Sequence, residues 1–169
     1  MTIHRSNPFA ADSDPVRRFR GRLGGAVSLW TAGAADDRAG LTVSSLMVAN
    51  GDPARVLALL DPDSTFAERL ATTGMAVVQL LTWDQRGLAD AFGGVAPAPG
   101  GAFRLGTWTQ TPHGPVLVDR THALVRLESL TEVGWSVLAT TTVEQIVVLE
   151  DKDQLEHRRG RYQRPGAPG

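Results

Sequence analysis

A strand-like run, Gly40-Leu41-Thr42-Val43-Ser44-Ser45-Leu46, contains three hydroxyl side chains. Hydroxyls and backbone N–H groups at the edge of a strand can hydrogen-bond the rim of a flat heteroaromatic ring. Two further motifs follow it, Asp61-Pro62-Asp63-Ser64-Thr65 and His157-Arg158-Arg159-Gly160-Arg161-Tyr162. The first of these places hydroxyls at a helix start, where unpaired N–H groups favour a phosphate. The motifs therefore predict a site with a polar end for an anion and an apolar slot for a planar ring.

The composition excludes several function classes. A chain of 169 residues fits one domain, which buries roughly two-thirds of the surface of its unfolded form. It contains no Cys, so thiol nucleophiles, thiolate metal sites and disulfides are excluded, and any redox chemistry must belong to a cofactor. The net charge is −1, which gives no overall positive field for nucleic acid. The polar N-terminus and the absence of an apolar run of ~20 residues predict a cytoplasmic protein without a membrane anchor.

The pattern of apolar residues predicts a mainly β fold. Strands are expected at 26–31, 41–48, 55–60 and 75–81. Three further strands are expected after the loop at 93–101, of which 121–128 alternates most cleanly, and a long run covers 135–149. The 55–60 strand is expected to be buried on both faces, and 135–149 is expected to bend midway because it is too long for one flat strand. Short helices are expected after Asp14, after a capping box at Thr65 and Glu68, and over 84–92. Many strands with about three short helices indicate a closed or partly closed antiparallel barrel.

A fourth motif strengthens the interpretation. The segment from Trp83 to Gly94, Trp-Asp-Gln-Arg-Gly-Leu-Ala-Asp-Ala-Phe-Gly-Gly, is a helix with an acidic, Gln/Arg start. In this order the four motifs resemble the flavin reductase-like, FMN-binding family over about residues 22–162. The resemblance implies a Greek-key split β-barrel over 14–162 that forms a homodimer, between a flexible arm at 1–13 and a flexible tail at 163–169. It also implies FMN, with FAD as an alternative, in a groove near the dimer interface, and NADH or NADPH as the reductant.

The resemblance also assigns candidate binding residues. It implies contacts to the isoalloxazine edge, largely through the backbone, from Thr42, Val43, Ser44 and Ser45, and contacts to the ribityl chain and phosphate from Asp61, Ser64 and Thr65. Arg86 or Arg55 could neutralise the phosphate, a task for which the Arg fork is suited. His157, Arg159 and Tyr162 are expected beside the flavin and nicotinamide, with Tyr162 as a wall of the ring slot and Phe92 as a second candidate wall. Each has an ordinary alternative: helix capping for Ser64 and Thr65, solvated surface for the arginines and the basic segment, and core packing for Phe92.

One departure from the family pattern bears on activity. Where many members have Gly-Asp-His near the nicotinamide, this chain has Val133-Gly134-Trp135. An indole can stack on a flat ring but cannot exchange protons. Two functions therefore stay open. The first is a flavin reductase that passes hydride from nicotinamide to flavin N5 and supplies reduced flavin to a separate oxygenase. The second is a non-enzymatic split-barrel module that binds flavin, haem or a protein with little nicotinamide turnover.

A metal centre is not expected. The four histidines lie far apart, without the paired spacing of metal ligands. The sequence also contains no nucleophile elbow, Walker loop or dinucleotide-binding glycine motif. Hydride transfer itself needs aligned rings and no side-chain acid or base, so no catalytic residue is predicted.

Overall fold

The computed structural model describes residues 14–166. The predicted arm, 1–13, and residues 167–169 of the predicted tail lie outside the described residues. Three α-helices occur within 14–166, and most of the remaining regular structure is antiparallel β, which confirms the predicted fold class. The last strand ends at Gln163, one residue beyond the predicted domain boundary.

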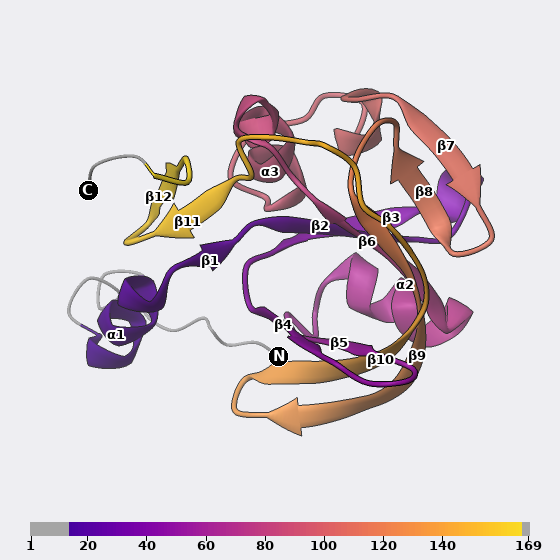
Figure 1. Ribbon diagram of the computed structural model, residues 1–169, viewed down its shortest axis with the longest axis horizontal. Helices are drawn as coiled ribbons and strands as arrows, with labels where there is room; N and C mark the ends of the chain where they lie inside the picture. The colour runs from indigo at the N-terminus through magenta and orange to yellow at the C-terminus, as the bar shows by residue number, and fades with distance from the viewer. Residues whose placement is uncertain (1–13, 167–169) are drawn as a thin grey trace.

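A single curled sheet forms the body of the molecule (Figure 1). Its seven strands lie in the order β3-β2-β6-β9-β10-β5-β4, and all neighbours are antiparallel. The bounds are β2 Ser28–Ala32, β3 Ala39–Val43, β4 Leu46–Ala49, β5 Arg55–Leu60, β6 Met75–Leu80, β9 His122–Val133 and β10 Ser136–Val147. The two edge strands, β3 and β4, are consecutive in the chain and are separated only by Ser44 and Ser45. The sheet therefore curls until its two ends meet at this dipeptide, which gives a split barrel.

The predicted strand at 41–48 is wrong in one respect, because it is two strands. Val43 pairs with Ser28 at one end of the sheet, whereas Leu46 pairs with Ala58 at the other. Because one flat strand cannot pair at both edges of the sheet, the pairing of β3 ends at Val43 and that of β4 begins at Leu46. The 55–60 strand has the predicted bounds, but it alternates: Val56, Ala58 and Leu60 are buried, and Leu59 is 40% exposed. The predicted burial of both faces is wrong because β5 faces the barrel interior on one side only.

The long strand β10 bends midway, as predicted for 135–149. β9 and β10 pair over almost their full length, with register shifts between Thr140 and Thr141 and between Val143 and Gln145. Such bulges increase the local twist of a strand, which lets a long ribbon follow the curled sheet. This pair supplies the middle of the barrel wall and ends in a hairpin turn at Gly134 and Trp135.

Two small sheets lie outside the barrel. β1 (Gly25–Ala26), β11 (Glu156–Arg158) and β12 (Arg161–Gln163) form a three-stranded sheet in the order β1-β11-β12. β7 (Trp108–Thr111) and β8 (Gly114–Leu117) form a hairpin. The sequence pattern predicts no strands after Glu150, so it misses β11 and β12.

The helices begin and end at clear local signals. α1 (Pro15–Leu23) is capped by Asp14, whose side chain accepts a hydrogen bond from the Val16 N–H at 3.0 Å. In α2 (Thr65–Thr73) the N-cap is Ser64, not the predicted Thr65, because the Ser64 hydroxyl accepts from the Ala67 N–H at 3.1 Å. α3 (Arg86–Phe92) follows a short 3₁₀ turn at Trp83–Gln85.

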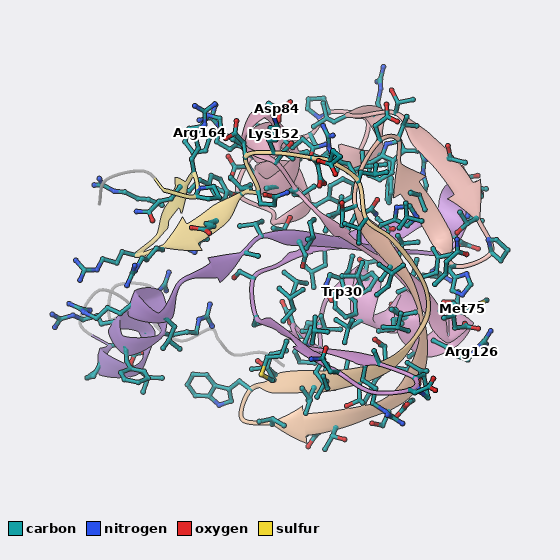
Figure 2. All side chains as sticks on the ribbon, viewed as in Figure 1. Trp30, Met75, Asp84, Arg126, Lys152 and Arg164 are labelled. Atoms are coloured by element: carbon teal, nitrogen blue, oxygen red, sulfur yellow. The ribbon has the colours of Figure 1, made fainter. Side chains whose placement is uncertain are left out.

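The barrel interior holds the main core around Trp30, which Figure 2 shows inside the curl. Trp30 is fully buried and meets Phe66 of α2 edge to face, with ring centroids 6.2 Å apart. A second core outside the barrel packs α3 against the following loop and the C-terminal segment, and it includes Val27, Leu29, Leu81, Leu88, Phe92, Leu117 and Leu155. The chain therefore has one apolar core on each face of β2.

A buried amide joins the barrel wall to the β7–β8 hairpin. Gln79 is fully buried; its Nε2 donates to Thr31 Oγ1 at 3.0 Å and to the Pro115 carbonyl at 3.3 Å, and its Oε1 accepts from the Leu117 N–H at 2.7 Å. Gln79→Leu is expected to lower the free energy of unfolding by roughly 2–3 kcal/mol, because it leaves the Leu117 N–H buried without a partner. Gln145→Leu on the exposed part of β10 is the control. Equal denaturation midpoints for the two variants would contradict this account.

Candidate functional site

A groove of about 820 Å³ opens where β3 passes into β4. Its walls come from four parts of the chain: α1, the Ser44-Ser45 junction with β4 and β5, Leu138 of β10, and the β11–β12 hairpin. Figure 1 shows α1 and the β11–β12 hairpin on the side of the barrel where the chain turns from β3 to β4. The groove therefore lies at the split of the barrel.

The Ser44-Ser45 junction is held by β5. Ser45 Oγ donates to the Leu59 carbonyl at 2.8 Å, and the Leu59 N–H donates to the Ser45 carbonyl at 3.1 Å. Ser44 is exposed and lines the groove. A Cβ added at Gly25 would lie 3.1 Å from the Ser44 carbonyl oxygen, so β1 passes close to the junction. Leu46, Leu59 and Leu138 add an apolar surface beside these polar groups.

The basic motif near the C-terminus is a tight hairpin. Its two turn residues, Arg159 and Gly160, both have positive φ values, 51° and 77°, as in a type I′ turn, which suits the twist of a two-stranded ribbon. The Arg159 N–H donates to the Gly21 carbonyl at 2.8 Å, which holds the turn against α1. On the other side, His157 pairs with Gly25 of β1. These contacts place His157, Arg159 and Gly160 along the groove.

α1 contributes residues that the sequence patterns do not single out. Arg17, Arg18, Arg20 and Arg22 line the groove, while the apolar side chains Val16, Phe19 and Leu23 are exposed at 74%, 68% and 68%. The spacing of the apolar residues predicts the helix, but it does not predict which face turns toward the barrel. The density of arginine in this helix is the signal that could have identified it as part of the site.

Two titratable groups of the hairpin are perturbed. Partial burial, with a further contribution from the positive charge of Arg20, lowers the pKa of His157 below its ordinary value of 6.5. The imidazole is therefore favoured in its neutral form. Burial and a hydrogen bond from the Tyr162 hydroxyl to Asp90 at 2.6 Å raise the pKa of Tyr162. Tyr162 packs against the second core and meets the His157 ring edge to face at 5.8 Å.

The other residues of the first two motifs have structural partners. Val43 is buried in the barrel core, and the Thr42 hydroxyl donates to the Ala89 carbonyl of α3 at 2.7 Å. Ser64 caps α2, and its hydroxyl also donates to the Asp61 carbonyl at 2.7 Å. Asp61, Ser64 and Thr65 are not among the residues that line the groove.

Several further candidates lie away from the groove. Arg86 stacks on the Trp83 ring with its guanidinium carbon 3.8 Å from the ring centroid, and Arg55 bonds Glu128 at 2.8 Å. Phe92 packs in the second core, with its ring 4.8 Å from that of Phe103. Trp135 is 78% exposed at the β9–β10 turn and does not line the groove.

A smaller hollow of about 360 Å³ lies near the start of α3. Figure 2 shows Asp84, Lys152 and Arg164 gathered there. Three carboxylates and three cationic side chains line it, so their charges offset one another and select no charged ligand. Among residues 14–166 no group of three or more His, Asp or Glu side chains could hold a metal ion, and no described helix is long and apolar enough to cross a bilayer. The groove at the barrel split is therefore the candidate site.

Comparison with known proteins agrees with this architecture. A family model described as a flavin reductase like domain matches residues 20–166. The chain belongs to the flavin reductase-like family. The FMN reductase (NADH) RutF of Ancylobacter novellus is 31% identical over 127 residues, which cover 74% of this chain and 70% of that relative.

Solved structures share the flavin reductase-like fold. The NADH:FAD oxidoreductase SgcE6 of Streptomyces globisporus C-1027 has a TM-score of 0.80 at 22% identity and covers 92% of this chain and 96% of its own. Nitrilotriacetate monooxygenase component B from Mycobacterium thermoresistibile has a TM-score of 0.82 at 19% identity, with 95% and 93% of the two chains covered. At these identities the similarity supports the fold, and the site is argued from its own residues.

Proposed function

We propose that this chain is an NADH-dependent flavin reductase that binds FMN in the groove at the barrel split. One observation supports it above the others: Ser44 and Ser45 line the same groove as His157 and Arg159, although the two pairs are more than a hundred residues apart in sequence. The family membership and the relative named FMN reductase (NADH) support the choice of cofactor and reductant.

The residues present fit a flavin nucleotide. The groove volume of about 820 Å³ lies within the range of roughly 300–1,000 Å³ typical of sites for small molecules and cofactors. Its apolar part, with Leu46, Leu59 and Leu138, suits a planar aromatic ring, and its cationic part suits a phosphate. The hydroxyl of the exposed Ser44 is available to hydrogen-bond the ring edge, while Ser45 holds the junction against β5.

The side chains of the groove have binding and positioning roles. A bound flavin would supply the two-electron redox chemistry that no side chain of a cysteine-free chain offers. Ser44 and Ser45 would orient the polar edge of the ring, and the leucines would exclude water from its apolar edge. His157, favoured in its neutral form, would border the ring without adding a full positive charge at neutral pH.

The finer points of the proposal are the cofactor, the partners and the location. The proposal is FMN in preference to FAD and NADH in preference to NADPH, in a cytoplasmic homodimer that supplies reduced flavin to a separate oxygenase. Exposed apolar side chains on β4 and at the β9–β10 turn, Met47, Val48 and Trp135, support a surface that a second copy covers. The similarity to a monooxygenase component supports the oxygenase partner.

A flavin titration tests the proposal. Adding the purified protein to FMN is expected to quench the flavin fluorescence in a saturable way, and NADH oxidation with FMN as acceptor is expected to follow. Saturable binding without NADH oxidation would favour the alternative, a flavin-binding module with little nicotinamide turnover. No saturable change up to about millimolar FMN, which corresponds to a binding free energy weaker than about −4 kcal/mol, would exclude a flavin site.

A further inference from the structure

We infer that the arginine face of α1 is the phosphate-binding wall of the groove, so that nucleotides enter with their phosphates toward α1 and not toward the start of α2. The inference rests on the proposed function and deepens it, because it assigns the anionic end of the ligand to a helix that the sequence motifs do not include. The ligand class is a phosphorylated nucleotide, either the flavin or the nicotinamide cosubstrate.

The charged side chains that line the groove, among the described residues, are all basic. Five arginines, Arg17, Arg18, Arg20, Arg22 and Arg159, line it together with His157, and no Asp or Glu among residues 14–166 does. The whole chain, in contrast, has a net charge of −1. Within residues 14–166 none of these five arginines forms an ion pair, whereas Arg55, Arg69, Arg126 and Arg164 each contact a carboxylate. A cluster of uncompensated arginines in a concave surface attracts an anion with several negative charges.

The wall is held in place by contacts of the backbone. Arg159 donates its N–H to the Gly21 carbonyl at 2.8 Å, and a Cβ added at Gly21 would lie 3.6 Å from the Arg159 Cα, so the turn and the helix are in contact. All five arginines are exposed residues, and among their guanidinium groups only that of Arg22 forms a hydrogen bond within the described chain, from Nη1 to the Arg18 carbonyl at 3.0 Å.

The start of α2 is a poor alternative for the phosphate. Ser64 Oγ already accepts from the Ala67 N–H and donates to the Asp61 carbonyl. The same loop contains the carboxylates of Asp61 and Asp63, and Asp61 Oδ1 accepts from the Asp63 N–H at 2.9 Å. An incoming phosphate would have to displace a formed cap and approach the Asp61 carboxylate. At the arginine face of α1 a phosphate would displace no helix cap and would approach no carboxylate among the described residues that line the groove.

The test compares ligands with and without phosphate. The double variant Arg18→Gln/Arg20→Gln is titrated with riboflavin and with FMN by fluorescence quenching. FMN affinity is expected to fall about 10- to 100-fold because charge-assisted hydrogen bonds are lost, while riboflavin affinity changes less than about twofold. Arg104→Gln is the matched control, since Arg104 is an exposed arginine outside the groove. Ser64→Ala is expected to leave the ratio of FMN to riboflavin affinity unchanged.

Measuring the KM for NADH shows whether the arginines bind the phosphate of FMN or the phosphates of the dinucleotide. If FMN affinity is unchanged but the KM for NADH rises about 10-fold in the double variant, the wall serves the dinucleotide, which also supports the inference. If both FMN affinity and the KM for NADH match those of Arg104→Gln, the inference is overturned and the proposed function stands. If the wild-type protein binds neither riboflavin nor FMN, the proposed function fails and the inference fails with it. Salt is a second measurement on the wild type: FMN binding is expected to weaken with ionic strength, and riboflavin binding is not.

Discussion

Ser44→Trp is expected to abolish FMN binding while leaving the fold intact. Ser44 is exposed at the junction of β3 and β4 and lines the groove, so an indole at this position occupies space that the flavin ring needs. Because no buried contact of Ser44 is lost, the free energy of unfolding is expected to stay within about 0.5 kcal/mol of the wild type, as for other surface substitutions. The affinity for FMN is expected to fall at least about 100-fold, which corresponds to ~2.8 kcal/mol.

The control for Ser44→Trp is the same bulky side chain placed elsewhere. Thr109 is exposed on β7, outside the groove, so Thr109→Trp tests the effect of an added surface indole alone. Fluorescence titration with FMN measures both variants, and thermal denaturation checks their folding. Wild-type FMN affinity in a folded Ser44→Trp protein would place the flavin site outside this groove.

Trp30→Ala is expected to have the largest effect on stability. Trp30 is fully buried inside the barrel, packs edge to face on Phe66, and donates its indole N–H to Ser28 Oγ at 3.1 Å. Removing the ring leaves a cavity that costs about 3–5 kcal/mol, a large part of a total stability of about 5–15 kcal/mol. Ser28 Oγ in turn donates to the Val43 carbonyl at 2.6 Å, so the disturbance reaches the residue before Ser44.

Trp135→Ala is the matched control for Trp30→Ala. Trp135 is 78% exposed at the β9–β10 turn, so its removal opens no cavity within the described chain. Chemical denaturation of both variants is expected to give a midpoint far below the wild type for Trp30→Ala and near it for Trp135→Ala, when both are measured at a protein concentration where all are monomers. Similar midpoints for the two variants would mean that the barrel core does not depend on Trp30.

Local signals in the sequence predict most of the elements. The apolar run of β6 and the length of the segment that becomes β10 lead to strands near their observed bounds. The alternation at 121–128 predicts only the first part of β9, which continues to Val133. The helix start at α2 is off by one residue, because Ser64 and Thr65 both have capping hydroxyls and the chain selects the one whose hydroxyl also reaches the Asp61 carbonyl. Neighbouring residues decide these features, so a single sequence contains the information.

Long-range pairing decides the features that the sequence patterns miss. The break at Ser44 exists because β3 and β4 belong to opposite ends of one curled sheet, and no local property of Val43-Ser44-Ser45-Leu46 reveals this. The type I′ turn at Arg159 and Gly160 lies in a segment of polar composition without the alternation that marks a strand. The face that α1 presents to the groove depends on where the hairpin of β11 and β12 meets it.

By itself the sequence determined the mainly β composition of the fold, the absence of thiol chemistry and the resemblance of its motifs to the flavin reductase-like family. Only the tertiary structure decided that Ser44 and Ser45 form the junction of the barrel, that Phe92 packs in a core, and that the arginines of α1 line the groove. The physical reason is the separation along the chain over which each effect acts. Periodicity and capping depend on residues a few positions apart, whereas the curl of a seven-stranded sheet brings together groups separated by more than a hundred residues.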